Sequence, residues 1–156
     1  MRRDGFGLVE TLLSLLIMMI LLSSIALIAW TPSATYLAHQ DADKLARWIG
    51  DAIARADRWK RNFSLHISVP QGEGAQHYML LSWTGDSGEH SDEFYAADGL
   101  RWVYSGTTKE ISYRWQTHTV TPAFVIEVRS SDGSLSGESL TVSVRGLLTR
   151  GHADDS

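Results

Sequence analysis

Residues 5–30 read GFGLVETLLSLLIMMILLSSIALIAW, and this stretch decides how the whole chain is organised. Its part from Thr11 to Trp30 contains 20 consecutive residues without a charge. A helix rises about 1.5 Å per residue, so such a run would be about 30 Å long, which matches the apolar thickness of a bilayer. The sequence therefore predicts a membrane-spanning helix at residues 6–30, with Arg2 and Arg3 held on the cytoplasmic side.

A polar domain follows the apolar segment. All but two of the 14 basic residues and all but two of the 18 acidic residues lie after Trp30, and the net charge is −4. This surplus of acidic residues gives the domain no general electrostatic attraction for nucleic acid. The chain contains no Cys, which excludes disulfides, thiolate nucleophiles and Cys-ligated zinc. With 44% apolar residues, the composition can supply the core of one domain.

Glu10 is a carboxylate at the leading edge of the apolar run. A carboxylate in a membrane costs a few kcal/mol, so such a residue usually has a specific partner. Two interpretations are open on position alone. The side chain of Glu10 either reaches the lipid headgroups at the membrane edge, or pairs with a cation that another molecule supplies.

The residues around Glu10 resemble a known processing signal. Gly5, Phe6 and Glu10 follow a short charged leader and precede the apolar run, as in the class III signal of type IV pilins and pseudopilins. The resemblance implies that prepilin peptidase cuts between Gly5 and Phe6 and methylates the new amine of Phe6. It also implies an assembly role for Glu10, as the partner of the Phe6 amine of a neighbouring subunit. A secretory signal cut near Ser33-Ala34 is the alternative.

The residues after Pro32 return to a helical period. Leu45, Ile49, Ala52, Ala56 and Trp59 recur at steps of four and three, which predicts one apolar helix face. We expect this amphipathic helix, within residues 31–62, to continue the first helix as one long helix.

From Phe63 the apolar period changes to two, which predicts strands separated by Gly-, Ser- and Asp-rich turns. The predicted strands begin near Phe63, Leu100, Ile111, Phe124 and Leu140. The predicted fold class is α+β, with a long N-terminal helix packed on an antiparallel sheet of six to seven strands. The predicted organisation is a leader at 1–5, a membrane or filament-core helix at 6–30, an amphipathic helix at 31–62 and a periplasmic β domain at 63–156.

Two longer stretches resemble the minor pseudopilin H group, the GspH/FimT family. They are HQDADKLARWIGDAIARADRWKRNFSLHISV from His39 and VIEVRSSDGSLSGESLTVSVRGLLTRG from Val125. The resemblance implies a non-catalytic minor pseudopilin of a type II secretion system, near the tip of a periplasmic pseudopilus that helps export folded proteins. The implied partners are other minor and major pseudopilins, prepilin peptidase and the inner membrane, which the chain crosses once, and no cofactor is implied.

Two other functions compete with this interpretation. A FimT-like minor pilin of a type IV pilus would bind DNA, and cationic side chains would have to carry that affinity. The candidates are Arg55, Arg58, Lys60 and Arg61 at one helix end, and Arg145, Arg150 and His152 near the C-terminus. Asp154 and Asp155 dilute the second set, so we do not expect a nucleic-acid partner. A membrane-anchored hydrolase is the other competitor, but no spacing places a base beside a nucleophile.

Remaining motifs offer weaker signals. Asp86, Glu89, Asp92 and Glu93 form a predicted acidic loop that could hold calcium, although their spacing is not that of an EF-hand and a solvated loop is the simpler interpretation. No other metal site is predicted, because the six His residues lack paired spacing.

Among the six Trp residues, Trp48 and Trp59 are predicted to face the sheet, and Trp83, Trp102 and Trp115 to lie in the core. A carbohydrate or partner platform is the alternative for these rings.

Overall fold

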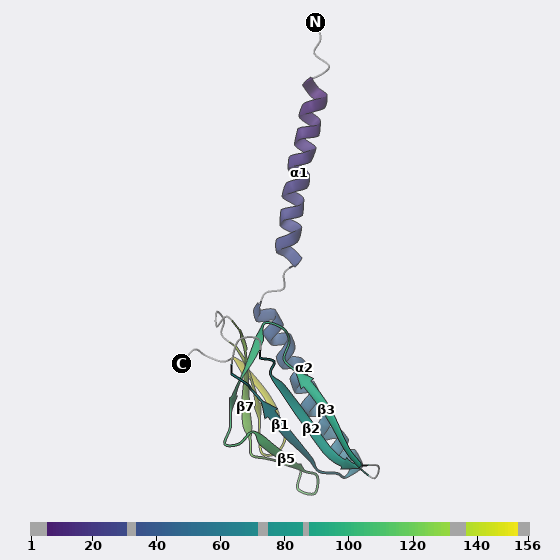
Figure 1. Cartoon of the computed structure of the whole chain (residues 1–156), viewed down its shortest axis with the longest axis vertical. Helices are drawn as coiled ribbons and strands as arrows, with labels where there is room; N and C mark the ends of the chain where they lie inside the picture. The colour runs from purple at the N-terminus through teal and green to yellow at the C-terminus, as the bar shows by residue number, and fades with distance from the viewer. Residues whose placement is uncertain (1–5, 31–33, 72–74, 86–87, 132–136, 153–156) are drawn as a thin grey trace. The chain divides into compact units, whose positions relative to one another are not determined.

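The computed structural model describes residues 6–30, 34–71, 75–85, 88–131 and 137–152 (Figure 1). The chain divides into two compact units, Met1–Ser33 and Ala34–Ser156. The first unit contains one helix, and the second contains a helix and all the described strands.

Helix α1 of the first unit runs over Phe6–Trp30 and is 25 residues long. Its described side chains are exposed to solvent within this single chain. Among the described residues, no helix combines the length and the apolarity that a membrane crossing requires.

Helix α2 opens the second unit and runs over Ala34–Trp59. The predicted single long helix is described as two helices, α1 and α2, and residues 31–33, which would join them, lie outside the described residues. The predicted apolar face is confirmed, because Leu45, Ile49 and Ala56 are buried. Lys60 follows the helix with a φ of 53°, in the left-handed region that is common just after a helix end.

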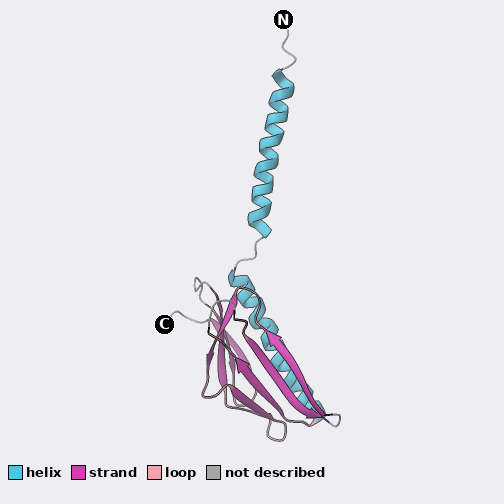
Figure 2. Ribbon diagram, viewed as in Figure 1, coloured by secondary structure: helices cyan, strands magenta, loops and turns pink. Residues whose placement is uncertain are grey.

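Nine strands are described, and they form two antiparallel sheets, coloured magenta in Figure 2. The five-stranded sheet has the order β3-β2-β1-β5-β6, from β1 (Phe63–Ser68), β2 (Tyr78–Gly85), β3 (Gly88–Tyr95), β5 (Glu110–Arg114) and β6 (Thr119–Thr121). The four-stranded sheet has the order β4-β7-β8-β9, from β4 (Leu100–Ser105), β7 (Phe124–Ser130), β8 (Glu138–Val142) and β9 (Leu148–His152).

Two parts of the predicted β structure are wrong. The prediction of six to seven strands in one sheet falls short, and the segment from Thr84, predicted as a loop, instead contains the end of β2 and the whole of β3. The reason is that β3 reads GEHSDEFY and lies at the edge of its sheet, where polar side chains are tolerated on both faces. An apolar alternation is therefore missing from β3, although its backbone pairs along eight residues of β2.

The core of the second unit lies between α2 and the inner faces of both sheets. The small side chains Ala42, Ala52 and Ala56 are buried on α2 and allow close approach of the strands. In the four-stranded sheet, Phe124, Ile126, Val128, Leu140 and Val142 alternate with more exposed residues and are buried. Figure 1 shows α2 alongside β2 and β3, and this packing positions the side chains described next.

Candidate functional site

The predicted processing and assembly residues lie at the start of α1. Gly5 lies outside the described residues, and Phe6 is the first residue of α1. Glu10 is exposed and has no ion pair or hydrogen bond to another described residue. It lines a shallow groove of the helix together with Gly7, Thr11, Ser14, Leu15 and Met18. The roles of Gly5, Phe6 and Glu10 stay predictions, and the geometry leaves the carboxylate of Glu10 accessible to a group from another chain.

The predicted calcium residues are divided between two faces of a strand. Asp86 lies outside the described residues, whereas Glu89, Asp92 and Glu93 lie on β3. Asp92 is paired in register with the buried Leu81, so it faces α2, where its Oδ2 accepts a hydrogen bond from Arg55 Nη2 at 3.0 Å. Glu89 and Glu93 lie on the opposite face, because side chains alternate along a strand. The described residues contain no group of three or more His, Cys, Asp or Glu side chains that could bind a metal ion.

The candidate DNA-binding cations are dispersed and partly paired. Arg55 pairs with Asp92 and lies over the ring of Trp83, 5.7 Å from its centroid. Arg150, on β9, forms an ion pair with Asp43 of α2 and contacts a ring nitrogen of His39 at 3.0 Å. These pairs neutralise two of the cations that a DNA surface would need.

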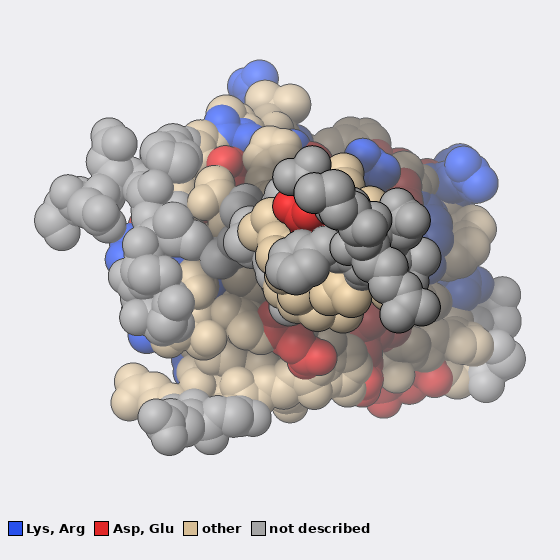
Figure 3. All heavy atoms as spheres, turned by 90° about the horizontal axis from the view of Figure 1, so that it is seen from above, with Lys and Arg blue, Asp and Glu red and all other residues tan. Residues whose placement is uncertain are grey.

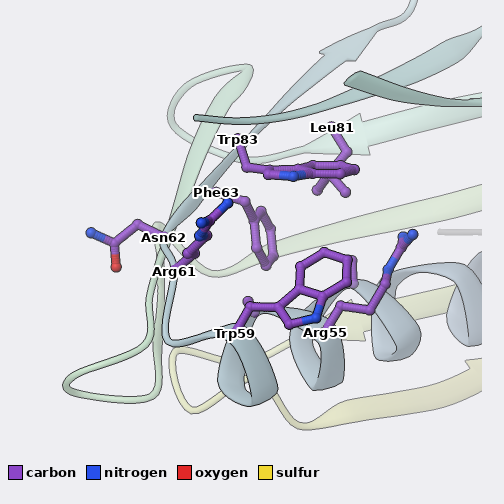
Figure 4. A pocket seen from close by; sticks show the side chains of 9 residues that line it. Arg55, Trp59, Arg61, Asn62, Phe63, Leu81 and Trp83 are labelled. Atoms are coloured by element: carbon purple, nitrogen blue, oxygen red, sulfur yellow. The ribbon is translucent and has the colours of Figure 1, made fainter. Parts of the chain in front are cut away.

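A recess lies between the C-terminal end of α2 and strands β1 and β2 (Figure 4). Trp59 of α2 and Trp83 of β2 line opposite sides of it, with ring centroids 6.3 Å apart. The other lining residues are Ala52, Arg55, Ala56, Arg61, Asn62, Phe63 and Leu81, and their side chains leave a cavity of only about 10 Å³. No carboxylate of the described residues lines the recess, so it offers aromatic and apolar surface with a cationic edge and no donor set for a metal.

The Trp residues on α2 face the sheet as predicted, whereas the predicted core Trp residues differ in burial. Trp59 is 50% exposed at the rim of the recess, but its ring faces Trp83 of β2, with ring centroids 6.3 Å apart. Trp48 packs on Phe94 of β3 with ring centroids 5.6 Å apart, as predicted. Trp102 is buried, whereas Trp83 and Trp115 are only partly buried.

A buried polar network was not predicted from the sequence. Asp41 of α2 is 3% exposed, and its Oδ1 accepts a hydrogen bond from the backbone N–H of Ala97 at 3.2 Å. Burial raises the pKa of this carboxyl, and the hydrogen bonds from Trp102 and Ala97 oppose the rise. His77 Nδ1 accepts a hydrogen bond from the backbone N–H of Trp102 at 2.9 Å. Only the interruption of the apolar face by an Asp could have signalled this site in the sequence.

Comparison with known proteins identifies the fold through structure alone. No family model matches the sequence, and no curated protein matches it significantly. The minor pseudopilin EpsH from the Type 2 Secretion System of Vibrio cholerae has a TM-score of 0.60 at 13% identity, over 76% of this chain and 98% of EpsH. The type IV minor pilin FimU of Pseudomonas aeruginosa has a TM-score of 0.52 in one crystal form and 0.51 in another, at 14% identity. These matches cover 71% and 72% of this chain and 85% and 91% of FimU. The chain therefore has the type IV pilin-like fold of such minor subunits.

Proposed function

We propose that the chain is a minor pseudopilin of a type II secretion system, a non-catalytic subunit of the periplasmic pseudopilus near its tip. In this function it helps to export folded proteins across the outer membrane. Its partners are other minor and major pseudopilins, and prepilin peptidase processes it. Residues 6–30 anchor it in the inner membrane in a single pass before assembly, and the domain that follows lies in the periplasm.

One observation carries the proposal: Phe6, the first described residue, already belongs to α1, and Glu10 is exposed one turn later. Cleavage between Gly5 and Phe6 would therefore leave a chain that begins with its helix, with a new amine at the helix N-terminus. A carboxylate at Glu10 of one subunit can then neutralise the amine of the next, which removes the cost of burying either charge alone. The likeness to EpsH over 76% of this chain supports the interpretation that the signal belongs to a pseudopilin.

The geometry of the second unit also favours a binding subunit over an enzyme. Its buried carboxylate, Asp41, is hydrogen-bonded to Trp102 and Ala97 and stabilises the fold. The recess at Trp59 and Trp83 is lined by apolar, aromatic and cationic side chains, which suit contact with another protein.

Mass spectrometry of the protein from cells that contain prepilin peptidase tests the proposal. We expect a mature chain whose first residue is N-methylated Phe6. A chain beginning near Thr35, or one that retains Met1 in the presence of an active peptidase, would contradict it. Deletion of the gene should then impair exoprotein secretion and leave pilus-dependent motility unchanged.

A minor pilin of a type IV pilus, FimT-like and with a role in DNA uptake, is the second candidate. The likeness to FimU favours it, since FimU is a type IV minor pilin. Gel-shift titration with duplex DNA near physiological salt separates the two candidates, because phosphate contacts carry most DNA affinity. We expect weak binding or none, because Arg55 and Arg150 are already paired with carboxylates. Micromolar or tighter affinity, lost in an Arg145→Ala/Arg150→Ala variant, would favour the pilus function.

A further inference from the structure

One face of α2 is exposed along most of the helix and is predominantly basic. It consists of six exposed residues at steps of four and three, here called the basic stripe: Gln40, Lys44, Arg47, Asp51, Ala54 and Arg58. At 3.6 residues per turn these steps keep all six on one side of the helix, away from the buried Leu45 and Ile49. The stripe carries three cations and one anion, a local net charge of +2 in a chain of net charge −4.

The charges of the stripe are available to a partner. Lys44, Arg47, Asp51 and Arg58 form no ion pair or hydrogen bond with another described residue. In contrast, the charged residues of α2 that flank the stripe are used inside the unit, as in the pairs Asp43–Arg150 and Arg55–Asp92. Within the unit, Lys44 interacts electrostatically with the buried Asp41, whereas Arg47 and Arg58 have no partner among the described residues.

A second surface of the same unit has the opposite charge. Residues paired across a strand register share a face, so Glu89, Glu93 and Glu110 all lie on the face of the five-stranded sheet that is turned away from α2. All three are exposed, and Glu93 accepts a hydrogen bond from the hydroxyl of Tyr95. Among the described strand residues, Arg114 is the Lys or Arg on that face. We call this surface the acidic sheet face. Figure 3, a view from above, shows basic and acidic side chains gathered in largely separate groups.

We propose that the basic stripe of α2 is a docking surface for the acidic sheet face of a neighbouring subunit with the same fold. The inference rests on the proposed function, because a pilin-like filament is the setting in which such subunits lie side by side. The two surfaces lie on different sides of the unit, so a contact between them is heterologous. A heterologous contact can repeat from subunit to subunit, and it builds a filament when the rotation between subunits does not close a ring.

The charge pattern favours this partner over nucleic acid. Three cations separated by one or two turns, with Asp51 among them, match a surface that presents a few spaced carboxylates. A DNA backbone carries a charge about every 1.7 Å and rewards an uninterrupted cationic row. Opposite charge between two protein faces sets orientation and partner choice more than affinity, which suits a register contact in an assembly held mainly by other elements.

Site-specific photocrosslinking of the full chain in its native cells tests the inference. An Ala54→p-benzoylphenylalanine variant places the crosslinker inside the stripe without removing a charge. We expect a crosslinked peptide from a pilin-like subunit that contains acidic residues on a strand. An Arg47→Glu/Arg58→Glu change in the same chain should reduce this adduct roughly tenfold, because like charges then face each other.

The matched control is Lys109→Glu/Arg145→Glu, which changes the net charge equally at two exposed positions outside the stripe. The adduct should survive in this control. Reversing one acidic residue of the identified partner to Lys should restore the adduct in the Arg47→Glu/Arg58→Glu chain. An adduct that is insensitive to the charge of the stripe, or one formed only with nucleic acid or lipid, would overturn the inference.

A second crosslinker, at Leu13 of α1, separates failure of this inference from failure of the proposed function. If position 13 crosslinks to pilin-like subunits and position 54 does not, the proposed function stands and the stripe is not a docking surface. If neither position crosslinks to a pilin-like subunit in cells that produce the whole system, both proposals fail.

Discussion

Asp41 and Trp102 join helix α2 to strand β4 through a buried hydrogen bond, in which Trp102 Nε1 donates to Asp41 Oδ2 at 3.1 Å. The same carboxylate accepts from the N–H of Ala97, so both of its oxygens are used. The network fixes the connection between β3 and β4 onto the helix. A buried, fully hydrogen-bonded carboxylate of this kind specifies one packing of the core.

We expect Asp41→Ala to lower the free energy of unfolding by about 1–3 kcal/mol, because the indole N–H and the Ala97 N–H would lose their acceptor. Asp51→Ala, at an exposed position of the same helix, should change it by less than about 0.5 kcal/mol. Urea unfolding followed by Trp fluorescence measures both. Equal effects in the two variants would show that the Asp41 network contributes little.

His77 should make the same region sensitive to pH. Burial lowers the pKa of His77 from the ordinary value of 6.5, because it disfavours the charged imidazolium, and the nearby charge of Arg101 lowers this pKa further. As the pH falls through 6.5, the unfolded chain therefore binds the proton before the folded chain does. The free energy of unfolding then decreases, by less than the ~1.4 kcal/mol per pH unit that a difference of one bound proton would give.

The measurement is the unfolding free energy between pH 7.5 and 5.5 in the parent chain and in His77→Asn, which keeps an acceptor oxygen near the position of Nδ1. The pH dependence should be smaller in His77→Asn than in the parent. His66→Asn, at an exposed position of β1, is the control and should keep the dependence of the parent. An unchanged slope in His77→Asn would show that another group titrates.

The period of the apolar residues predicted much of the fold. Leu45 and Ile49 are buried on α2, and Phe63, Leu65 and Ile67 are buried on β1, as their spacing indicated. The spacing of apolar residues did not predict β3, because an edge strand pairs through its backbone and tolerates polar side chains on both faces. It also failed to separate the two sheets, since which strands pair depends on contacts distant in sequence.

The functional residues also fall into two groups, those that could be recognised in the sequence and those that only the fold brings together. The signal of Gly5, Phe6 and Glu10 is contiguous and could be recognised in the sequence. Asp41 with Trp102, and Arg55 with Asp92, are 61 and 37 residues apart, and only the folded register brings them together. The acidic residues of β3 looked like one loop cluster, although strand alternation places Asp92 on one face and Glu93 on the other.

Two glycines should respond oppositely to replacement by Ala. A Cβ at Gly137 would lie 2.5 Å from the backbone oxygen of Val128, so Gly137→Ala should destabilise the domain by about 1–3 kcal/mol through overpacking. A Cβ at Gly50 of α2 would meet Leu148 Cδ1 at 3.5 Å, an ordinary contact. Gly50→Ala should therefore stabilise the domain, by up to about 1 kcal/mol from helix propensity. Thermal unfolding of both variants checks the signs, and two changes of the same sign would contradict the packing described.

Glu10 provides the test of how subunits align. In a filament core an unpaired carboxylate is expensive, so a Glu10→Leu variant should still be inserted and cleaved but should enter filaments poorly, because it cannot pair with the Phe6 amine of a neighbour. Glu10→Asp keeps the charge on a shorter side chain and should assemble better than Glu10→Leu. The measurement is the amount of the protein in sheared filaments, relative to the amount of processed protein in the membrane. If Glu10→Leu entered filaments as efficiently as the parent, the carboxylate would have no role in register, and the groove of Gly7, Thr11 and Ser14 around it would have to align the helices by shape alone.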